Sequence, residues 1–210
     1  MRDIIKDALR FDDRFPDFGD RRYSSLVRDV KIYSNIGFKK NLGEPSVVEV
    51  LQSVAPLIEL RNYKSTIPMT KNLLNLLELV HDISVLEFED TKFANDESPR
   101  KLFLKLISME GILMPSASAV FHFCHPNKFP IVDRYVFYAC KDIYQKYSIF
   151  KHHKKPVSPN HCVGHRAVDN YGEYIRFIDE LKRYLNSRYN YRLTYRRLDK
   201  ALMVYGKELR

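Results

Sequence analysis

The sequence contains no tryptophan, only three cysteines and no apolar run long enough to cross a membrane. The scattered Cys124, Cys140 and Cys162 are too few for a disulfide framework and are typical of reduced thiols in a cytoplasm. The first residues, MRDIIKDALRFDD, lack the apolar core of a signal peptide. We therefore expect a soluble cytoplasmic protein with no membrane partner.

Composition and length are those of a globular chain. Apolar residues make up 45% of the 210 residues and charged residues 29%, which excludes a disordered protein. The length fits a single compact domain over residues 1–210, or two lobes that share a core. No internal repeat or low-complexity tract divides the chain.

Positive charge is concentrated in one part of the sequence. The formal net charge is +9, and about 17 Lys and Arg stand against about 7 Asp and Glu after Asp133. Such a surface attracts polyanions, nucleic acids among them, and speeds their encounter. A surface that serves only solubility has the same composition, so the charge alone does not choose between the two interpretations.

Apolar residues recur at helical spacing along most of the chain, so we expect a mostly or entirely α fold. Strand-like alternation is confined to residues 85–93. Ser98-Pro99 is expected to begin one helix, as a cap followed by Pro at the first helical position. The full set of helices is expected over 46–60, from Thr70 through Val80, over 98–109, over 115–124, from Asp133 through Tyr144, over 170–188, and after a cap at Thr194.

One stretch, MEGILMPSASAVFHFCHPNKFPIVD, ends on a lone carboxylate, Asp133, placed directly after the apolar Ile131-Val132. Asp is among the preferred residues at helix N-termini, so a capping role is the simplest interpretation. A role in chemistry is the alternative. The two are compatible, because one carboxylate can cap a helix and face a substrate.

The order helix, Gly-containing turn, small-residue helix, apolar segment and Asp resembles the helix–hairpin–helix DNA glycosylase superfamily, which includes endonuclease III and the adenine glycosylases. Its pattern is approximately L-P-G-h-G-x-x-T-A-x-A-h, followed about fourteen residues later by h-h-h-D, where h is apolar. Residues 109–112 fall on the L-P-G-h start, and Ala117 and Ala119 fall on the two small positions. Residues 129–133 fall on the apolar run and its catalytic aspartate, Asp133. The motif spans about 99–124, and the match covers about 30 of the 210 residues.

Three departures from the family pattern narrow the expectation. Leu113 replaces the second hairpin glycine, which indicates a modified hairpin and a weaker grip on DNA. Pro115 occupies the position of the lysine of bifunctional members and cannot form a Schiff base. No tight Cys spacing exists to hold the iron–sulfur cluster of the endonuclease III branch. The resemblance therefore implies no lyase step, no metal and no other cofactor.

What the resemblance implies is a monofunctional DNA N-glycosylase that flips a damaged, mismatched or modified base out of double-stranded DNA. Asp133 would stabilise the positive sugar of the transition state and orient the attacking water. In a bacterium such a protein would be associated with the nucleoid. Two rival hypotheses remain: a non-catalytic nucleic-acid-binding protein on the same fold, and a helical protein without a nucleic-acid role.

The DNA contacts are expected at the hairpin and in the tail. Hairpin amide groups would bind a phosphate, although an ordinary helix–helix connection has the same sequence signs. In the tail, Tyr195 and Leu198 are expected to pack inward while the arginines contact phosphates. The candidate residues are Gly111, Ile112, Leu113, Met114 and Ser116 in the hairpin and Arg192, Arg196 and Arg197 in the tail.

Histidines form a second constellation. The run H-C-x-x-H at 161–165, with His152 or His153, offers ligands of the kind that zinc binds, which makes His152, His161, Cys162 and His165 weak metal candidates. Their spacing is not that of paired ligand pairs, and a basic loop over about 150–165 is the alternative. His122 and His125 are expected to be structural.

Overall fold

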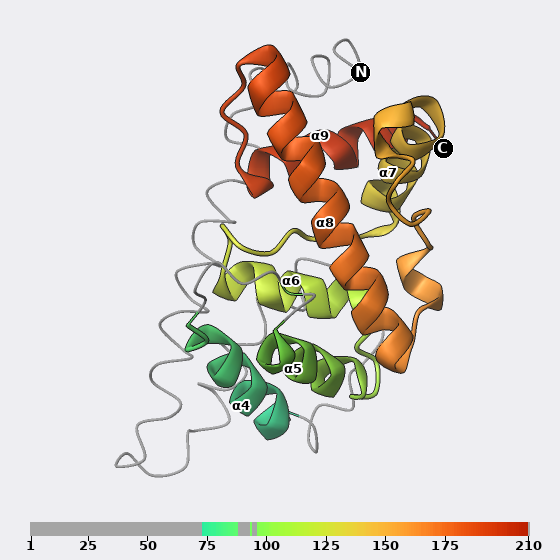
Figure 1. The fold of residues 1–210 in the computed structure, drawn as a ribbon. Coiled ribbons are helices and arrows are strands. Elements are labelled where there is room, and N and C mark those ends of the chain that lie inside the picture. The colour runs from blue at the N-terminus through green and yellow to red at the C-terminus, as the bar shows by residue number, and fades with distance from the viewer. Residues whose placement is uncertain (1–72, 88–92, 94–95, 210) are drawn as a thin grey trace.

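The computed structural model describes residues 73–87, 93 and 96–209 (Figure 1). These residues are mainly helical and contain no strand, which confirms the all-α expectation. Two short 3-10 helices, η1 (Ser148–Phe150) and η2 (Pro159–His161), interrupt the loop that follows α7. The helices are α4 (Leu73–Ser84), α5 (Glu97–Ile107), α6 (Met114–Cys124), α7 (Arg134–Lys146), α8 (Gly164–Tyr189) and α9 (Tyr195–Glu208).

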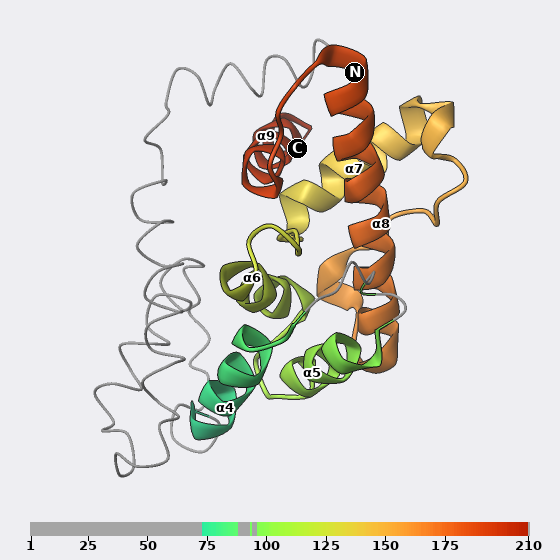
Figure 2. The same ribbon diagram turned by 60° about the vertical axis from the view of Figure 1, so that its left-hand side comes forward.

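Helix α8 connects two groups of helices. Its first part lies beside α5 and α6, which also contact α4, and its other end leads into α9, which packs on α7 (Figures 1 and 2). At 26 residues it is about 40 Å long, enough to run past both groups. The segment between α6 and α7 carries the chain from one group to the other and ends at Asp133.

Aromatic side chains fill the core between α5, α6 and α8. Phe103 stacks on Tyr171 with ring centroids 4.4 Å apart, and Phe121 meets Phe129 edge to face at 5.0 Å. Phe93 contacts all four of these rings, and each of the five is at most 3% exposed. Burial of each ring contributes about 1.5–3 kcal/mol, so this cluster fixes the α6–α8 contact beside the segment before Asp133.

The predicted start of α9 agrees with the structure, whereas the predicted starts of α5 and α8 differ from it. The side chain of Asp96, not Ser98, caps α5, because it accepts a hydrogen bond from the Ser98 amide at 3.0 Å. Helix α8 begins at Gly164, six residues before the expected start, since Ala167 and Val168 already face the core. Thr194 caps α9 as expected, with Oγ1 accepting from the Arg197 amide.

Two expectations fall partly or wholly beyond the described part of the chain. The helix expected over 46–60 and the cap at Thr70 lie outside the described residues, whereas α4 confirms a helix through Val80. The strand-like alternation over 85–93 is not a strand where it is described, since residues 85–87 and 93 form turns or irregular backbone.

Candidate active site

Asp133 is the N-cap of α7, as the sequence predicts. Its Oδ1 accepts hydrogen bonds from the amides of Tyr135 at 2.8 Å and Val136 at 2.9 Å. Within the described residues no donor contacts Oδ2, and the side chain is only half-buried. The carboxylate is therefore held in one orientation through one oxygen, and no described residue hydrogen-bonds to the other.

Three side chains fix the segment that delivers Asp133 to this position. Ser118 Oγ donates to the Pro115 carbonyl at 2.8 Å and accepts from the Val132 amide at 3.1 Å. Tyr171 Oη donates to the Pro130 carbonyl at 3.0 Å. Because both hydroxyl groups are fully buried, these bonds are made in a region of low dielectric constant, where they are strong. They tie the backbone before Asp133 to α6 and α8.

His122 is the third side chain that holds this segment. Its Nδ1 lies 2.6 Å from the Phe129 carbonyl, which can only accept, so Nδ1 carries the hydrogen. Burial lowers the pKa of His122 to about 4, against the raising effect of that hydrogen bond, and the ring is neutral at pH 7. His125 likewise lies 2.5 Å from the Ile83 carbonyl through Nε2. Both histidines have the structural role expected of them.

The charge of Asp133 affects the pKa values of two buried groups, Cys140 and Tyr174. Burial raises the pKa of the Cys140 thiol, and the charge of Asp133 raises it further. The pKa of Tyr174 is also raised, first by burial and then in part by Asp133. Both groups therefore stay protonated at neutral pH, and neither is a nucleophile beside the carboxylate.

Two cations that the sequence analysis did not single out lie at the start of α7. Arg134 Cζ is 4.6 Å and Lys207 Nζ 5.5 Å from the centre of the Tyr135 ring, and both residues are exposed. Lys207 reaches this position because Gly206 of α9 lies against the Tyr135 backbone. Only the long-range contact between α7 and α9 brings Lys207 here, so no local pattern could have identified it.

The predicted hairpin connects α5 to α6. Gly111 has φ +81°, a conformation that glycine adopts without strain, and the Ile112 amide donates to the Met109 carbonyl at 3.1 Å. The side chains of Ile112 and Met114 are buried, so only their backbone could contact a phosphate. Leu113, the N-cap of α6, is 37% exposed at the tip.

Carboxylates lie beside this hairpin. An open groove between α4 and α5 is lined by Glu78, Asp82 and Glu110, and Lys105 is the one cation among its described lining residues. Like charges repel, so this side of the turn disfavours a polyanion. A phosphate would have to approach the hairpin from the first turn of α6, where Ser116 is half-buried.

The three predicted tail arginines lie at the other end of α9 from Asp133. Arg192 is exposed just before the helix, and Arg196 is ion-paired with Asp199 at 3.5 Å. Arg196 and Gly206 are separated by about 15 Å of helix, and Gly206 is the residue against α7. The structure therefore does not bring Arg192, Arg196 and Arg197 to Asp133, whereas Tyr195 and Leu198 are buried as expected.

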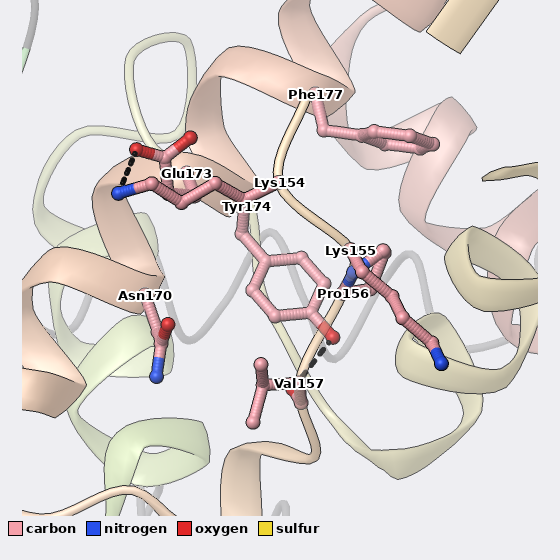
Figure 3. Close-up of a pocket in the computed structure, with 8 residues that line it drawn as sticks. All are labelled: Lys154, Lys155, Pro156, Val157, Asn170, Glu173, Tyr174 and Phe177. Carbon is pink, nitrogen blue, oxygen red and sulfur yellow. Dashed lines mark hydrogen bonds and ion pairs between the residues drawn. The ribbon is translucent and has the colours of Figure 1, made fainter. Parts of the chain in front are cut away.

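The expected basic loop is fastened to α8. Tyr174 Oη donates to the Val157 carbonyl at 3.1 Å, and Lys154 pairs with Glu173 at 3.2 Å (Figure 3). The pocket between them has a volume of about 10 Å³, room for at most one water molecule. It is too small for a base, and Lys154 shares Glu173 with Arg176, which contacts the same carboxylate oxygen at 3.0 Å.

The four weak metal candidates do not form one cluster. Cys162 is buried, where its thiol donates to the Ser158 carbonyl at 3.3 Å and accepts from Asn170 at 3.0 Å. His161 and His165 are exposed. His152 instead joins His153 and Glu180, a carboxylate from the middle of α8 that the spacing of histidines could not indicate.

Comparison with known proteins gave no relative. No protein-family model matches the chain, and no curated protein or solved structure matches it either. Among the described residues, no helix has the length and apolar character needed to span a membrane. An assignment of function therefore rests on the geometry and chemistry of the residues themselves.

Proposed function

We propose that this protein is a monofunctional DNA N-glycosylase whose catalytic carboxylate is Asp133. The observation that carries the proposal is the unequal use of its two oxygens. Oδ1 accepts both capping hydrogen bonds, and Oδ2 has no donor among the described residues. A carboxylate held in this way keeps its orientation at no further entropic cost when a substrate arrives.

The main chemical requirement of this reaction is a negative charge fixed near the sugar. When the bond between base and sugar breaks, the bonding electron pair leaves with the base, and positive charge develops on the sugar. Oδ2 would stabilise that charge and accept a proton from the water whose oxygen bonds to the sugar carbon. The positive end of the α7 helix dipole lies beside this carboxylate. Pro115 offers no amine, so the DNA backbone would stay intact.

Cations beside the carboxylate support a nucleic-acid substrate. Arg134 and Lys207 are exposed near the Tyr135 ring, next to Asp133. A base flipped toward Asp133 stays attached to two phosphates, which need positive partners close to the site. Exposed cations at the start of α7 therefore support the proposal.

A non-catalytic DNA-binding protein on the same fold is the second candidate. Its support lies in two departures from the family pattern, Leu113 in place of the second hairpin glycine and Pro115 in place of the lysine, because both change positions that the catalytic members use. The acidic groove with Glu78, Asp82 and Glu110 disfavours a phosphate beside the turn under either candidate. Under this candidate, duplex binding depends on salt, and changes at Asp133 leave it unaffected.

The decisive experiment measures abasic-site formation in duplex oligonucleotides that carry damaged, mismatched and modified bases, with hot alkali to reveal cleavage. Wild type is compared with Asp133→Asn, because Asn is an equally good cap and α7 stays folded. We expect abasic sites from wild type and a loss of at least about a hundredfold in the variant. Equal product from both proteins would remove Asp133 from the mechanism.

Duplex binding separates the remaining hypotheses. Each phosphate contact contributes about 0.9 to the slope of log affinity against log salt. Arg134→Gln should reduce that slope by about 0.9, whereas Lys146→Gln, at the opposite end of the same helix, should leave it unchanged. Salt-dependent binding without abasic product would favour the second candidate. If the protein forms no abasic product and does not bind the duplex, the results would favour a helical protein without a nucleic-acid role.

A further inference from the structure

Two histidines and a carboxylate converge where the loop after α7 meets α8. His153 Nε2 lies 2.8 Å and His152 Nε2 lies 3.0 Å from the same atom, Oε2 of Glu180. All three potential ligand atoms are within 4.8 Å of one another. Two imidazole nitrogens and one carboxylate oxygen form a donor set that zinc and other divalent transition metals bind.

Packing fixes the two segments that carry these groups. The ring of Phe150 is fully buried against Phe177, with centroids 5.1 Å apart, and His153 lies 5.4 Å from the same Phe177 ring. Phe177 is about one turn before Glu180 on α8. The His153 amide donates to the Phe150 carbonyl at 3.1 Å and closes the turn. The relative positions of His153 and Glu180 are thus set before any ligand binds.

The spacing of the three atoms is close to what an ion requires. Around a tetrahedral zinc ion with bonds of about 2.0–2.1 Å, neighbouring ligand atoms lie about 3.3 Å apart. The nitrogen–oxygen separations of 2.8 and 3.0 Å therefore have to open by about 0.3–0.5 Å. His152 can rotate to allow this, because its side chain is 60% exposed, whereas that of His153 is only 9% exposed.

Nearby lysines are engaged elsewhere. Lys154 is paired with Glu173 at 3.2 Å, as Figure 3 shows, and the ammonium group of Lys151 lies 4.5 Å from the centre of the Tyr144 ring. Arg176 also contacts Glu173 Oε1, at 3.0 Å, so Lys154 shares this carboxylate. The repulsion that these lysines exert on a bound cation is thereby reduced, and Glu180 supplies one negative charge to the ion.

We propose that His152, His153 and Glu180 bind one divalent transition-metal ion of the zinc class and leave a fourth position for water. Three protein ligands with one open position distinguish exchangeable or reactive zinc sites from closed structural ones. The three proposed ligands are distinct from the residues that hold Asp133, and in the sequence all of α7 lies between Asp133 and His152. The metal site therefore does not depend on the proposed glycosylase activity.

The test is calorimetric titration of the full chain with zinc chloride after treatment with a chelator and exchange into metal-free buffer. Wild type should bind one ion. His152→Ala and Glu180→Gln should each weaken binding by at least about tenfold, because even loss of an outer partner costs about 10–100-fold. His165→Ala removes an exposed histidine outside the cluster and should bind as wild type does.

Thermal unfolding gives a second readout that does not require a known activity. Zinc should raise the melting temperature of wild type and of His165→Ala, and should raise that of Glu180→Gln by less at the same zinc concentration. Circular dichroism checks that each variant is folded, and truncation of the exposed His152 does not disturb the core. The proposal is overturned if zinc does not bind saturably, or if His152→Ala and Glu180→Gln bind it as tightly as wild type.

Discussion

The contact between Gly206 and Tyr135 allows a prediction whose sign is set by two opposing effects. A Cβ added to Gly206 would lie 1.9 Å from the Tyr135 carbonyl oxygen and 2.6 Å from its carbonyl carbon. Both are backbone atoms within α7, so they cannot rotate away as a side chain would. Overpacking of this kind costs about 1–3 kcal/mol, and a clash with backbone belongs at the upper end of that range.

Helix propensity acts in the opposite direction. Alanine is favoured over glycine inside a helix by about 1 kcal/mol, so Gly206→Ala should stabilise α9 if nothing touches it. With the clash, we expect a net loss of about 2 kcal/mol in the free energy of unfolding. The melting temperature should fall by about 4–8 °C for a protein of this size.

Urea unfolding and thermal melting measure this change, and amide NMR locates it. The signals of Tyr135 and Val136, which donate to Asp133, should shift in Gly206→Ala. Gly164→Ala is the matched control, because nothing lies within 4 Å of its added Cβ. Its φ of +55° still costs about 1–2 kcal/mol, but those amide signals should not move. A Gly206→Ala protein as stable as wild type, or more so, would refute the close packing of α7 and α9.

Three further predictions concern the segment before Asp133. Ser118→Ala leaves the buried Val132 amide without its acceptor and should cost about 1–3 kcal/mol by urea unfolding, whereas Ser187→Ala, at an exposed serine of α8, should change stability by less than about 0.5 kcal/mol; equal effects would contradict the bridging role of Ser118. Tyr171→Phe should lower the free energy of unfolding by about 1 kcal/mol, because the hydrogen bond to the Pro130 carbonyl is lost. An unchanged free energy of unfolding would mean that this hydrogen bond does not stabilise the segment. Because the pKa of His122 is lowered to about 4 in the folded protein, the unfolded chain binds this proton more readily. The contribution of His122 to the free energy of unfolding is therefore complete above pH 6.5 and falls by about 1.4 kcal/mol per pH unit below it, toward pH 4. His122→Gln should show a correspondingly flatter dependence of unfolding free energy on pH between 7 and 5, and an unchanged dependence would assign the proton uptake elsewhere.

The sequence predicted those features of the site that are encoded within a few residues. Asp133 caps α7 through amides two and three positions away, and Thr194 caps α9 in the same local way. The predicted start of α5 was wrong. Asp96 and Ser98 are both favourable cap residues only two positions apart, and the structure uses Asp96. Residue preferences at helix N-termini thus indicate that a cap is present, but they do not decide between two suitable residues that lie close together.

The missed features depend on the packing of distant segments. Tyr171 reaches the Pro130 carbonyl across 41 positions, and Glu180 meets His153 across 27. Lys207 comes to the start of α7 only because Gly206 permits the helices to approach. A pattern read along the chain could single out the histidines as candidate ligands, but it could not tell which carboxylate the long α8 would place beside them.

The dependence of α7 on α9 has a consequence for synthesis. The hydrogen bond from Tyr205 to Asp142 joins residues 63 positions apart, so α7 leaves the ribosome well before its partner helix. At about 5–20 residues per second, that gap lasts roughly 3–13 s. During this time the face of α7 that α9 covers is open to water and to other chains, and the Lys207 side of the Asp133 site does not yet exist. Nascent chains stalled before residue 195 should therefore be the species that engages chaperones, and they should lack the finished site.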